Sequence, residues 1–327
     1  MCTAISFKTK DHYFGRTLDY ECSFGEEVVL CPRNSHLGFR YTEDMDSHYA
    51  IIGMAHVSKG YPLYYDAANE KGLCIAGLNF VKSTRYAPKR SEEKVNLLQF
   101  ELIPWLLGRC ASVDEAVEEI EKIDLMGEPF SEKLPTAHLH WMIADRERAV
   151  TVEAAEQGIM VYENPVGVLT NEPPFPVQLF SLNDYMGLSP KQPKNQFSSA
   201  LALTSYSRGM GALGLPGDVS SRSRFVRASF VKMNSVSGDS EEESVGQFFH
   251  ILGSVEQVRG SCEVADGEYE MTVYTSCINA SKGIYYYTTY SNRQITAVDI
   301  HREELDGRDL CCFPLIKAEQ IKRQNGA

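Results

Sequence analysis

Helical patterns in this chain come in pairs, and each pair lies between blocks of strand patterns. One pair is predicted over Asn96–Cys110 and Ser112–Ile123, and the other over Ser220–Met233 and Glu241–Val258. In a parallel α/β sheet single helices would separate the strands, so the paired order argues against that class. We therefore predict an α+β fold with helices layered on antiparallel sheets, and two sheets face to face are an option.

Strand patterns bounded by turn residues cover most of the remaining chain. They are predicted at Cys2–Thr9, His12–Tyr20, Glu27–Cys31, Tyr49–Met54, Leu63–Asp66, Leu73–Phe80, His138–Ala144, Ala149–Glu153, Ile159–Tyr162, Gly167–Thr170, Tyr269–Cys277, Gly283–Tyr290 and Gln294–Ile300. The turn Lys10-Asp11 joins the first two strands as a hairpin. Because no linker rich in Pro, Gly or Ser separates two self-sufficient parts, residues 1–327 are predicted to form one domain.

The charge balance argues against several classes of partner. The chain carries 44 acidic and 32 basic residues, a formal net charge of -12, and no basic stripe. Such a field repels phosphate backbones and anionic membrane surfaces, so nucleic-acid and membrane partners are not expected. Charges interrupt the first twenty residues, and no apolar run reaches the roughly 20 residues that span a bilayer. A cytoplasmic location is therefore predicted.

Three sequence patterns could indicate a bound ligand or a disulfide, but the residues around each of them do not support that interpretation. Gly209 to Gly214 have a dinucleotide-binding spacing after a predicted strand at Ala200–Tyr206, but they run into a turn rather than a helix. His138 and His140 share a strand face but lack a nearby third zinc ligand. The nine cysteines contain no C-x-x-C pair, which favours buried, reduced thiols over disulfides or a zinc ribbon. No metal and no cofactor are predicted.

Cys2 has more distinctive chemistry. Aminopeptidases remove an initiator methionine that precedes a small residue, and this would leave Cys2 with a free α-amine. An amine of pKa about 7.7–8.0 is well matched to take the proton of a thiol of pKa about 8.5. Nucleophile and base would then belong to one residue. By itself, however, a cysteine at the second position is more often incidental than nucleophilic.

The second strand of the hairpin adds two charged neighbours to Cys2. Arg16 and Asp19 could both approach the first residue of strand one. An arginine favours the thiolate form of a cysteine, and an aspartate accepts hydrogen bonds from an α-ammonium. Their spacing of three residues is odd, so a bend or bulge is expected to align them. Without further signals the pair would be interpreted as a structural salt bridge.

Longer motifs extend this pattern along the chain. They are Met1-Cys-Thr-Ala4, Phe14-Gly-Arg-Thr-Leu-Asp19, Asn69-Glu-Lys-Gly-Leu-Cys-Ile-Ala-Gly-Leu-Asn-Phe80, Gly167-Val-Leu-Thr-Asn171 and Leu215-Pro-Gly-Asp-Val-Ser-Ser-Arg-Ser-Arg-Phe225. In this order they resemble the choloylglycine hydrolases, a family of N-terminal-nucleophile hydrolases. The resemblance implies an αββα sandwich, with two antiparallel sheets between helix layers, and hydrolysis of an amide without a cofactor.

The resemblance also implies a catalytic site, made of Cys2, Arg16, Asp19, Asn79, Asn171 and Arg224. Cys2 would be nucleophile and base, with Arg16 and Asp19 supporting its thiol and amine. We assign Asn79 to the oxyanion hole, because an amide N–H can stabilise the tetrahedral intermediate. Asn171 would orient the amine or the scissile group, and Arg224 would brace the charge network. Without the resemblance, each Asn would be interpreted as a turn residue and Arg224 as a surface charge.

Two branches of the family share this chemistry, the bile salt hydrolases and the penicillin V acylases. The position of Asn79 is often Tyr in the acylases and Asn in the bile salt hydrolases, so conjugated bile acids are the favoured substrate. By resemblance, Leu18, Phe130 and Leu134 form the apolar wall that holds the steroid. Relatives frequently carry an aromatic residue where this chain has Ser58, so this chain departs from the family pattern at that position.

Tyr61, Tyr64 or Tyr65 could compensate for the missing aromatic residue. Three functions therefore stay open from the sequence: a bile salt hydrolase, a penicillin V acylase with the same chemistry, and a non-catalytic steroid-binding protein in which Cys2 is inert. The first is favoured, and the choice between glycine and taurine conjugates is not determined. The resemblance further implies a bacterial protein that forms homotetramers.

Overall fold

The computed structural model describes residues 1–325 and contains two large antiparallel sheets. The six-stranded sheet has the order β12 (Val168–Leu169), β1 (Cys2–Lys8), β2 (His12–Tyr20), β15 (Met271–Asn279), β16 (Ile284–Thr289) and β17 (Asn292–Asp299). The eight-stranded sheet has the order β11 (Gly158–Glu163), β10 (Ala149–Ala155), β9 (Leu139–Ala144), β6 (Cys74–Asn79), β5 (Tyr61–Asn69), β4 (Ile51–Ser58), β3 (Glu27–Cys31) and β18 (Cys311–Pro314). Two strands of each sheet, β1 with β2 and β5 with β6, carry most of the candidate site.

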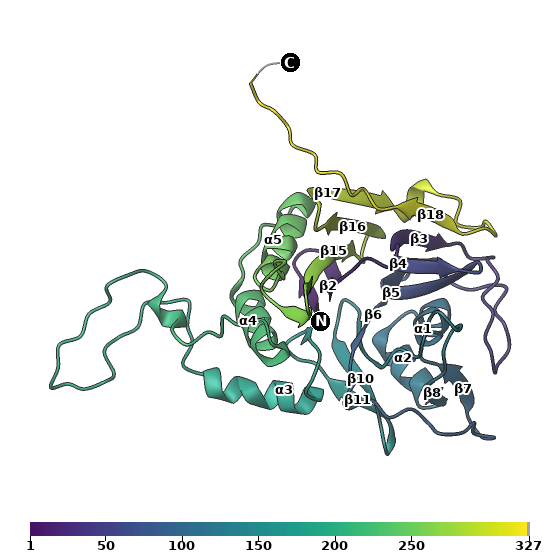
Figure 1. The fold of residues 1–327 in the computed structure, drawn as a ribbon, viewed down its shortest axis with the longest axis horizontal. Helices are drawn as coiled ribbons and strands as arrows, with labels where there is room; N and C mark the ends of the chain where they lie inside the picture. The colour runs from purple at the N-terminus through teal and green to yellow at the C-terminus, as the bar shows by residue number, and fades with distance from the viewer. Residues whose placement is uncertain (326–327) are drawn as a thin grey trace.

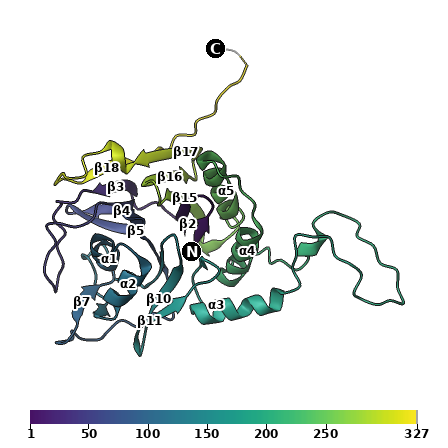
Figure 2. The same ribbon diagram turned by 180° about the vertical axis from the view of Figure 1, so that it is seen from behind.

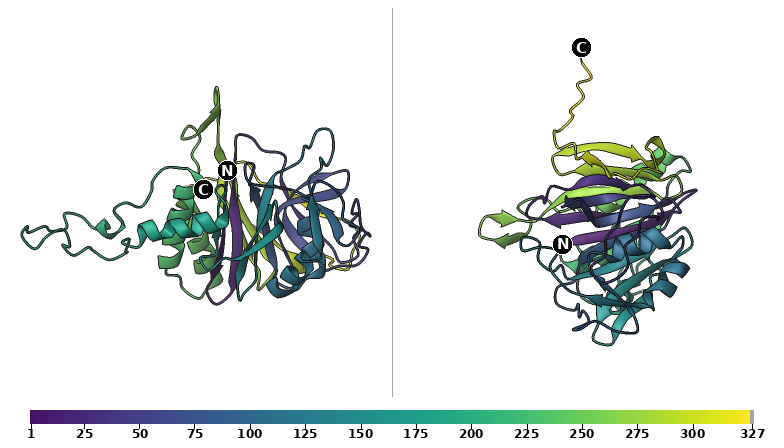
Figure 3. Two further views of the ribbon diagram at one scale, coloured as in Figure 1. Left: turned by 90° about the horizontal axis from the view of Figure 1, so that it is seen from below. Right: turned by 90° about the vertical axis from the view of Figure 1, so that its right-hand side faces the viewer.

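Helices cover the outer faces of both sheets (Figures 1 and 3). α4 (Ser221–Asn234) and α5 (Glu241–Gly253) pack on the six-stranded sheet, and α1 (Leu102–Arg109) and α2 (Val113–Ile120) cover the eight-stranded one. The sandwich of two antiparallel sheets between helix layers is therefore confirmed. α3 (Phe175–Ser181) follows β12, and the short 3-10 helices are η1 (Leu182–Tyr185), η2 (Met210–Ala212) and η3 (Ile300–Arg302).

Strand alternation explains how one sheet serves two cores. On β3, Val28 and Leu30 belong to the core shared with β1, β2 and β15, whereas Val29 and Cys31 belong to the core beneath α1. Successive side chains of a strand point to opposite faces, so a sheet covered on both sides is apolar on both. The first core fills the space between the two sheets and continues beneath α4 and α5, and Cys2 at the start of β1 belongs to it.

The predicted helix at Asn96–Cys110 is wrong in its first part. β7 (Val95–Leu98) pairs in parallel with β8 (Ile123–Met126), and α1 begins only at Leu102. Pro104 has no backbone N–H to donate, which confines it to the first turn of a helix and fixes this start. In contrast, Ser112 caps α2 as its sequence indicated, because its side chain accepts a hydrogen bond from the Glu115 backbone N–H.

Other differences concern one loop, one helix and three short strands. The predicted strand at Ala200–Tyr206 is not formed; these residues belong to a long loop between η1 and α4 that extends away from the body (Figures 1 and 2). α3 was not predicted, although Pro176 lies in its first turn, where Pro is favoured. The short strands β13 (Glu263–Ala265), β14 (Glu268–Tyr269) and β18 were also missed. Within residues 1–325, no helix is long and apolar enough to cross a membrane.

Candidate active site

Cys2 is the first residue of β1 and is buried at the edge of the core between the sheets. It pairs with Leu18 on β2, and Ala4 pairs with Arg16, so these four side chains share the face toward the eight-stranded sheet. The Arg16 guanidinium donates hydrogen bonds to the backbone carbonyls of Tyr65, at 3.2 Å, and Gly77 in that sheet. Arg16 is thus held between the two sheets beside Cys2.

Arg16 stays charged in this buried position. Burial alone would lower its pKa, but the Cys2 side chain and the buried carboxylates of Asp66 and Asp19 raise it above the ordinary value for arginine. The Arg16 guanidinium is therefore a fixed positive charge close to the cysteine. A fixed cation beside the sulfur can stabilise negative charge that develops there during a reaction.

Asp19 approaches from the opposite face of β2, so the expected bend or bulge in β2 is not what brings it to the site. The β2 ladder with β1 is regular, and the register shift lies instead on β15, between Thr272 and Tyr274. The Asp19 carboxylate accepts hydrogen bonds from the hydroxyls of Thr272, at 2.7 Å, and Thr17, at 3.1 Å. Burial raises the pKa of Asp19, while Arg224 and the terminal ammonium act in the opposite direction.

Asn171 connects the head of β1 to α4. Its Oδ1 accepts hydrogen bonds from the Cys2 backbone nitrogen, at 2.9 Å, and from Arg224 Nη2, at 2.7 Å. Arg224 also donates through Nη1 to the Cys2 carbonyl, at 2.5 Å, and to the Thr3 hydroxyl, at 2.6 Å. Arg224 is fully buried, so it is not the surface charge that its helix position alone would suggest.

Asn79 joins the cluster through its backbone. Its carbonyl accepts a hydrogen bond from Asn171 Nδ2 at 2.9 Å. Among residues 1–325, the Asn79 side-chain amide makes no hydrogen bond, and the residue is half-buried at the end of β6. The amide is therefore available to a group outside the protein. All six residues predicted for the site are brought together within this network or its immediate neighbours.

The Met1 α-ammonium is held by Asp19 and Glu270. It donates to the Asp19 carbonyl and to Glu270 Oε1, both at 2.5 Å. With Met1 attached, the Cys2 nitrogen is a peptide amide and cannot act as a base. Glu270 was not found from the sequence, since its contact spans 269 residues and no local motif marks it.

The predicted substrate residues divide into two groups. Leu18 is buried on the Cys2 face of β2. Phe130 lies in a loop with Leu134, and its ring packs against Tyr61 and Phe100 at centroid distances of 5.8 and 5.2 Å. No hydrogen bond or ring contact within residues 1–325 joins this aromatic cluster to Cys2. The steroid-binding role of these loop residues stays a prediction.

Tyr64 and Tyr65 differ from Tyr61 in their surroundings. Tyr64 is buried and donates to the Val29 carbonyl at 3.4 Å, in the core beneath α1. Tyr65 contributes its backbone carbonyl to Arg16. Tyr61 lies beside a predicted substrate residue, in contact with Phe130.

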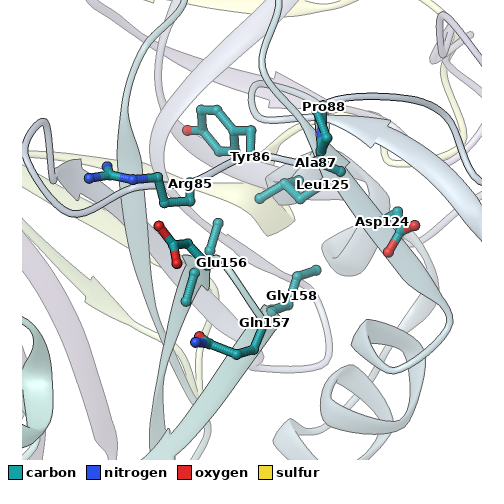
Figure 4. Close-up of a pocket in the computed structure, with 12 residues that line it drawn as sticks. Arg85, Tyr86, Ala87, Pro88, Asp124, Leu125, Glu156, Gln157 and Gly158 are labelled. Carbon is teal, nitrogen blue, oxygen red and sulfur yellow. The ribbon is translucent and has the colours of Figure 1, made fainter.

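The histidines and the hollow on the eight-stranded sheet lie outside this network. His140 contacts the Glu153 carboxylate at 3.2 Å and the Thr170 carbonyl at 2.8 Å, while exposed His138 stacks on Tyr86. Within residues 1–325, no group of three or more His, Cys, Asp or Glu could hold a metal ion. A hollow of about 480 Å³ is lined by Arg85, Glu156 and their neighbours, and none of the six predicted site residues lines it (Figure 4).

Comparisons with known proteins show which sequences this chain is similar to. The family model described as linear amide C-N hydrolases, choloylglycine hydrolase family, matches residues 2–313. A protein named bile salt hydrolase/transferase from Lactiplantibacillus plantarum is 55% identical, covering 99% of this chain and 100% of the relative. A bile salt hydrolase/transferase from Clostridium perfringens is 37% identical over the same shares of the two chains.

Solved structures show the same fold. The crystal structure of a mutant conjugated bile acid hydrolase from Clostridium perfringens matches with a TM-score of 0.92 and 36% identity, covering 99% of this chain and 100% of the other. Penicillin V acylase from Agrobacterium tumefaciens matches with a TM-score of 0.72 and 22% identity, covering 94% of this chain and 90% of the other. At that identity the second likeness concerns the fold alone.

Proposed function

Because this chain belongs to the choloylglycine hydrolase family of linear amide C-N hydrolases, we propose that it is a bile salt hydrolase. Its substrates would be bile acids conjugated to glycine or taurine. The observation that carries the proposal is the full-length similarity to the Lactiplantibacillus plantarum enzyme, at 55% identity. The position of Cys2 supports it. Cys2 is the first residue of β1, its backbone nitrogen donates a hydrogen bond to Asn171, and its carbonyl accepts one from Arg224.

The reaction begins once Met1 has been removed. The Cys2 thiol adds to the amide carbonyl carbon of the substrate, and the new α-amine takes the thiol proton. The C–N bond then breaks, the ammonium returns the proton to the leaving nitrogen, and glycine or taurine departs from a Cys2 thioester. Water adds to the thioester with the amine again as base, and cleavage of the C–S bond releases the bile acid and restores the thiol.

The surrounding groups have distinct proposed roles in these steps. Arg16 stabilises negative charge on the sulfur, and Asp19 compensates the positive charge of the amine. The Asn79 side-chain amide donates a hydrogen bond to the oxyanion of the tetrahedral adduct. Asn171 fixes the amine by accepting a hydrogen bond from it, and Arg224 keeps Asn171 and the Cys2 carbonyl in place.

Replacement of the nucleophile tests the proposal. We expect Cys2→Ala to reduce release of glycine from glycocholate and of taurine from taurocholate to background, with an unchanged circular dichroism spectrum. Cys22→Ala, which changes an exposed cysteine in the same way, should keep wild-type turnover. Full activity in Cys2→Ala would contradict the mechanism.

Two comparisons separate the alternatives. A kcat/KM for penicillin V above that for taurocholate would identify an acylase instead. A wild-type protein whose intact mass retains Met1, and whose Cys2 is not alkylated preferentially, would support the non-catalytic binding protein.

We further propose that the protein forms homotetramers in the bacterial cytoplasm. The loop between η1 and α4 exposes apolar side chains, including Phe197 and Tyr206, which are 83% and 84% exposed. Exposed apolar groups gathered on a projecting segment are typical of protein interfaces. All nine cysteines are free, as is usual for proteins in a reducing compartment.

A further inference from the structure

Glu270 lies between β14 and β15 and directs a buried carboxylate at the N-terminus of the chain. The residue is 6% exposed, and its Oε1 accepts the hydrogen bond from the Met1 α-ammonium at 2.5 Å. Its Oε2 is also buried and has no hydrogen-bond partner among residues 1–325. A buried carboxylate is costly without a cation or donors, so its position calls for a compensating charge.

Removal of Met1 changes which nitrogen provides that charge. One residue of extended chain spans at most about 3.6 Å, so the Cys2 α-amine would lie within about 6 Å of the Glu270 carboxylate. The nitrogen of Met1, one residue before the Cys2 nitrogen, donates hydrogen bonds to both Glu270 and the Asp19 carbonyl. A water molecule at that point could donate to both oxygens and accept a hydrogen bond from the Cys2 ammonium.

We propose that Glu270 is a positioning residue for the catalytic amine, acting through a water molecule at the place of the Met1 nitrogen. The inference rests on the proposed function, in which Cys2 becomes the N-terminal residue. Glu270 orients the amine and stabilises the ammonium that forms when Cys2 attacks the substrate. It touches neither the substrate nor the sulfur, so it acts through the amine.

Charges from several elements surround this amine. Arg16 on β2 and Arg224 on α4 disfavour its protonated form, and Asp19 on β2 and Glu270 favour it. The other titratable neighbours are Tyr20 at the end of β2 and Cys262 before β13. Burial raises the pKa of the Cys262 thiol, and Glu270 raises it further, while the terminal ammonium lowers it. Glu270, Cys262 and the N-terminus therefore share one electrostatic environment.

Neutralising Glu270 should make the surroundings of the Cys2 amine more positive, because Arg16 and Arg224 remain while one carboxylate is lost. In Glu270→Gln the amine then loses its proton at lower pH, because its protonated form has lost a stabilising carboxylate. We expect the acidic limb of the kcat/KM profile for glycocholate to move down by at least about half a pH unit. At the pH optimum, kcat should fall severalfold with little change in KM, since the substrate does not contact Glu270.

A second measurement makes the test independent of bile salt turnover. The rate of Cys2 alkylation by iodoacetamide is followed against pH by mass spectrometry of the N-terminal peptide, on protein lacking Met1, because Cys22 and Cys312 are also exposed. In Glu270→Gln we expect its midpoint to move to lower pH, together with the acidic limb. If the wild type releases no amino acid from bile salts, the proposed function fails, and the alkylation midpoint still decides the role of Glu270.

Two variants serve as controls. Glu268→Gln removes the same charge from an exposed neighbour and should leave both the acidic limb and the midpoint in place. Glu270→Asp keeps the carboxylate but shortens the side chain by one methylene, so it should shift the acidic limb and the midpoint less than Glu270→Gln does. It also provides a test if Glu270→Gln impairs folding. An unchanged midpoint in Glu270→Gln, an equal shift in Glu268→Gln, or an Asp variant that matches Gln would overturn the proposal.

Discussion

Asn79 and Asn171 have the same side chain, but the fold engages them differently. Asn171 binds Cys2, Arg224 and Asn79 at once, whereas the Asn79 amide makes no hydrogen bond within residues 1–325. A donor without a protein partner costs little to remove in the resting state. The same donor can contribute about 2.7–4 kcal/mol if it binds a developing oxyanion.

We therefore predict that Asn79→Ala separates catalysis from stability. kcat for glycocholate should fall by about 10²–10³, while the free energy of unfolding changes by less than about 1 kcal/mol. Asn171→Ala is the matched comparison, and it should lower both quantities, because it leaves the buried Arg224 with one partner fewer. Steady-state kinetics and urea unfolding of the two variants provide the measurements. Equal losses of stability in both variants would contradict the assignment.

The candidate residues illustrate what local sequence can and cannot reveal. The hairpin register that places Arg16 beside Cys2 follows from strand alternation and a short turn, and both were readable in the sequence. Asp19 was correctly placed near the N-terminus but for the wrong reason, since it uses the opposite face of β2. Glu270 could not be predicted, because only the pairing of β15 with β2 brings it to Met1.

At the scale of elements, a buried carboxylate on β5 links the two sheets. Asp66 accepts hydrogen bonds from the hydroxyls of Tyr274, at 2.6 Å, Tyr285, at 2.7 Å, and Ser276, at 2.9 Å. These three donors lie on β15 and β16, in the other sheet. Burial raises the pKa of Asp66, although Arg16 and the three hydroxyls lower it. The sandwich is thus joined by polar contacts as well as by its apolar core.

Removing one of these donors should weaken the contact between the sheets. We predict that Tyr285→Phe lowers the free energy of unfolding by about 1–3 kcal/mol, because an acceptor in the core loses a partner. Tyr286→Phe is the control: its hydroxyl binds Glu241 on α5, outside the sandwich core, and it should cost less than about 1 kcal/mol. Guanidinium unfolding measures both, and a Tyr286→Phe loss as large as that of Tyr285→Phe would refute the cross-sheet role.

The wrong prediction of a helix from Asn96 also has a physical cause. The sequence at Asn96–Leu98 is compatible with a helix, and only its pairing with β8 makes it a strand. Such a parallel pairing is a tertiary contact that overrides local pattern. Pro104, however, was a local signal that the helix could not begin at Asn96, since proline in a helix interior removes a hydrogen bond and clashes with the preceding turn.

At the scale of the whole molecule, the loop between η1 and α4 stands out because a single copy of the chain does not bury its apolar side chains. It projects from the body beside α3 and α4 (Figures 1 and 2), and its short-range hydrogen bonds, such as Gln192 to Ser207 and Asn195 to Leu201, stabilise only the loop itself. The sequence predicted a strand at Ala200–Tyr206, which begins with four apolar residues in succession. The chain's own core does not bury these side chains: Leu201, Leu203 and Tyr206 are all exposed.

We expect these exposed side chains to be buried in interfaces with neighbouring copies of the chain. We predict that the wild type elutes as a tetramer in size-exclusion chromatography with light scattering, and that Phe197→Ser combined with Tyr206→Ser shifts it to smaller species. Burying one large aromatic side chain contributes roughly 1.5–3 kcal/mol per copy, and loss of two on every copy should lower the association constant at least a hundredfold. Phe180→Ser, which changes an exposed aromatic residue on α3 outside the loop, should leave the tetramer intact. A monomeric wild type, or dissociation caused equally by Phe180→Ser, would show that the loop does not hold the copies together.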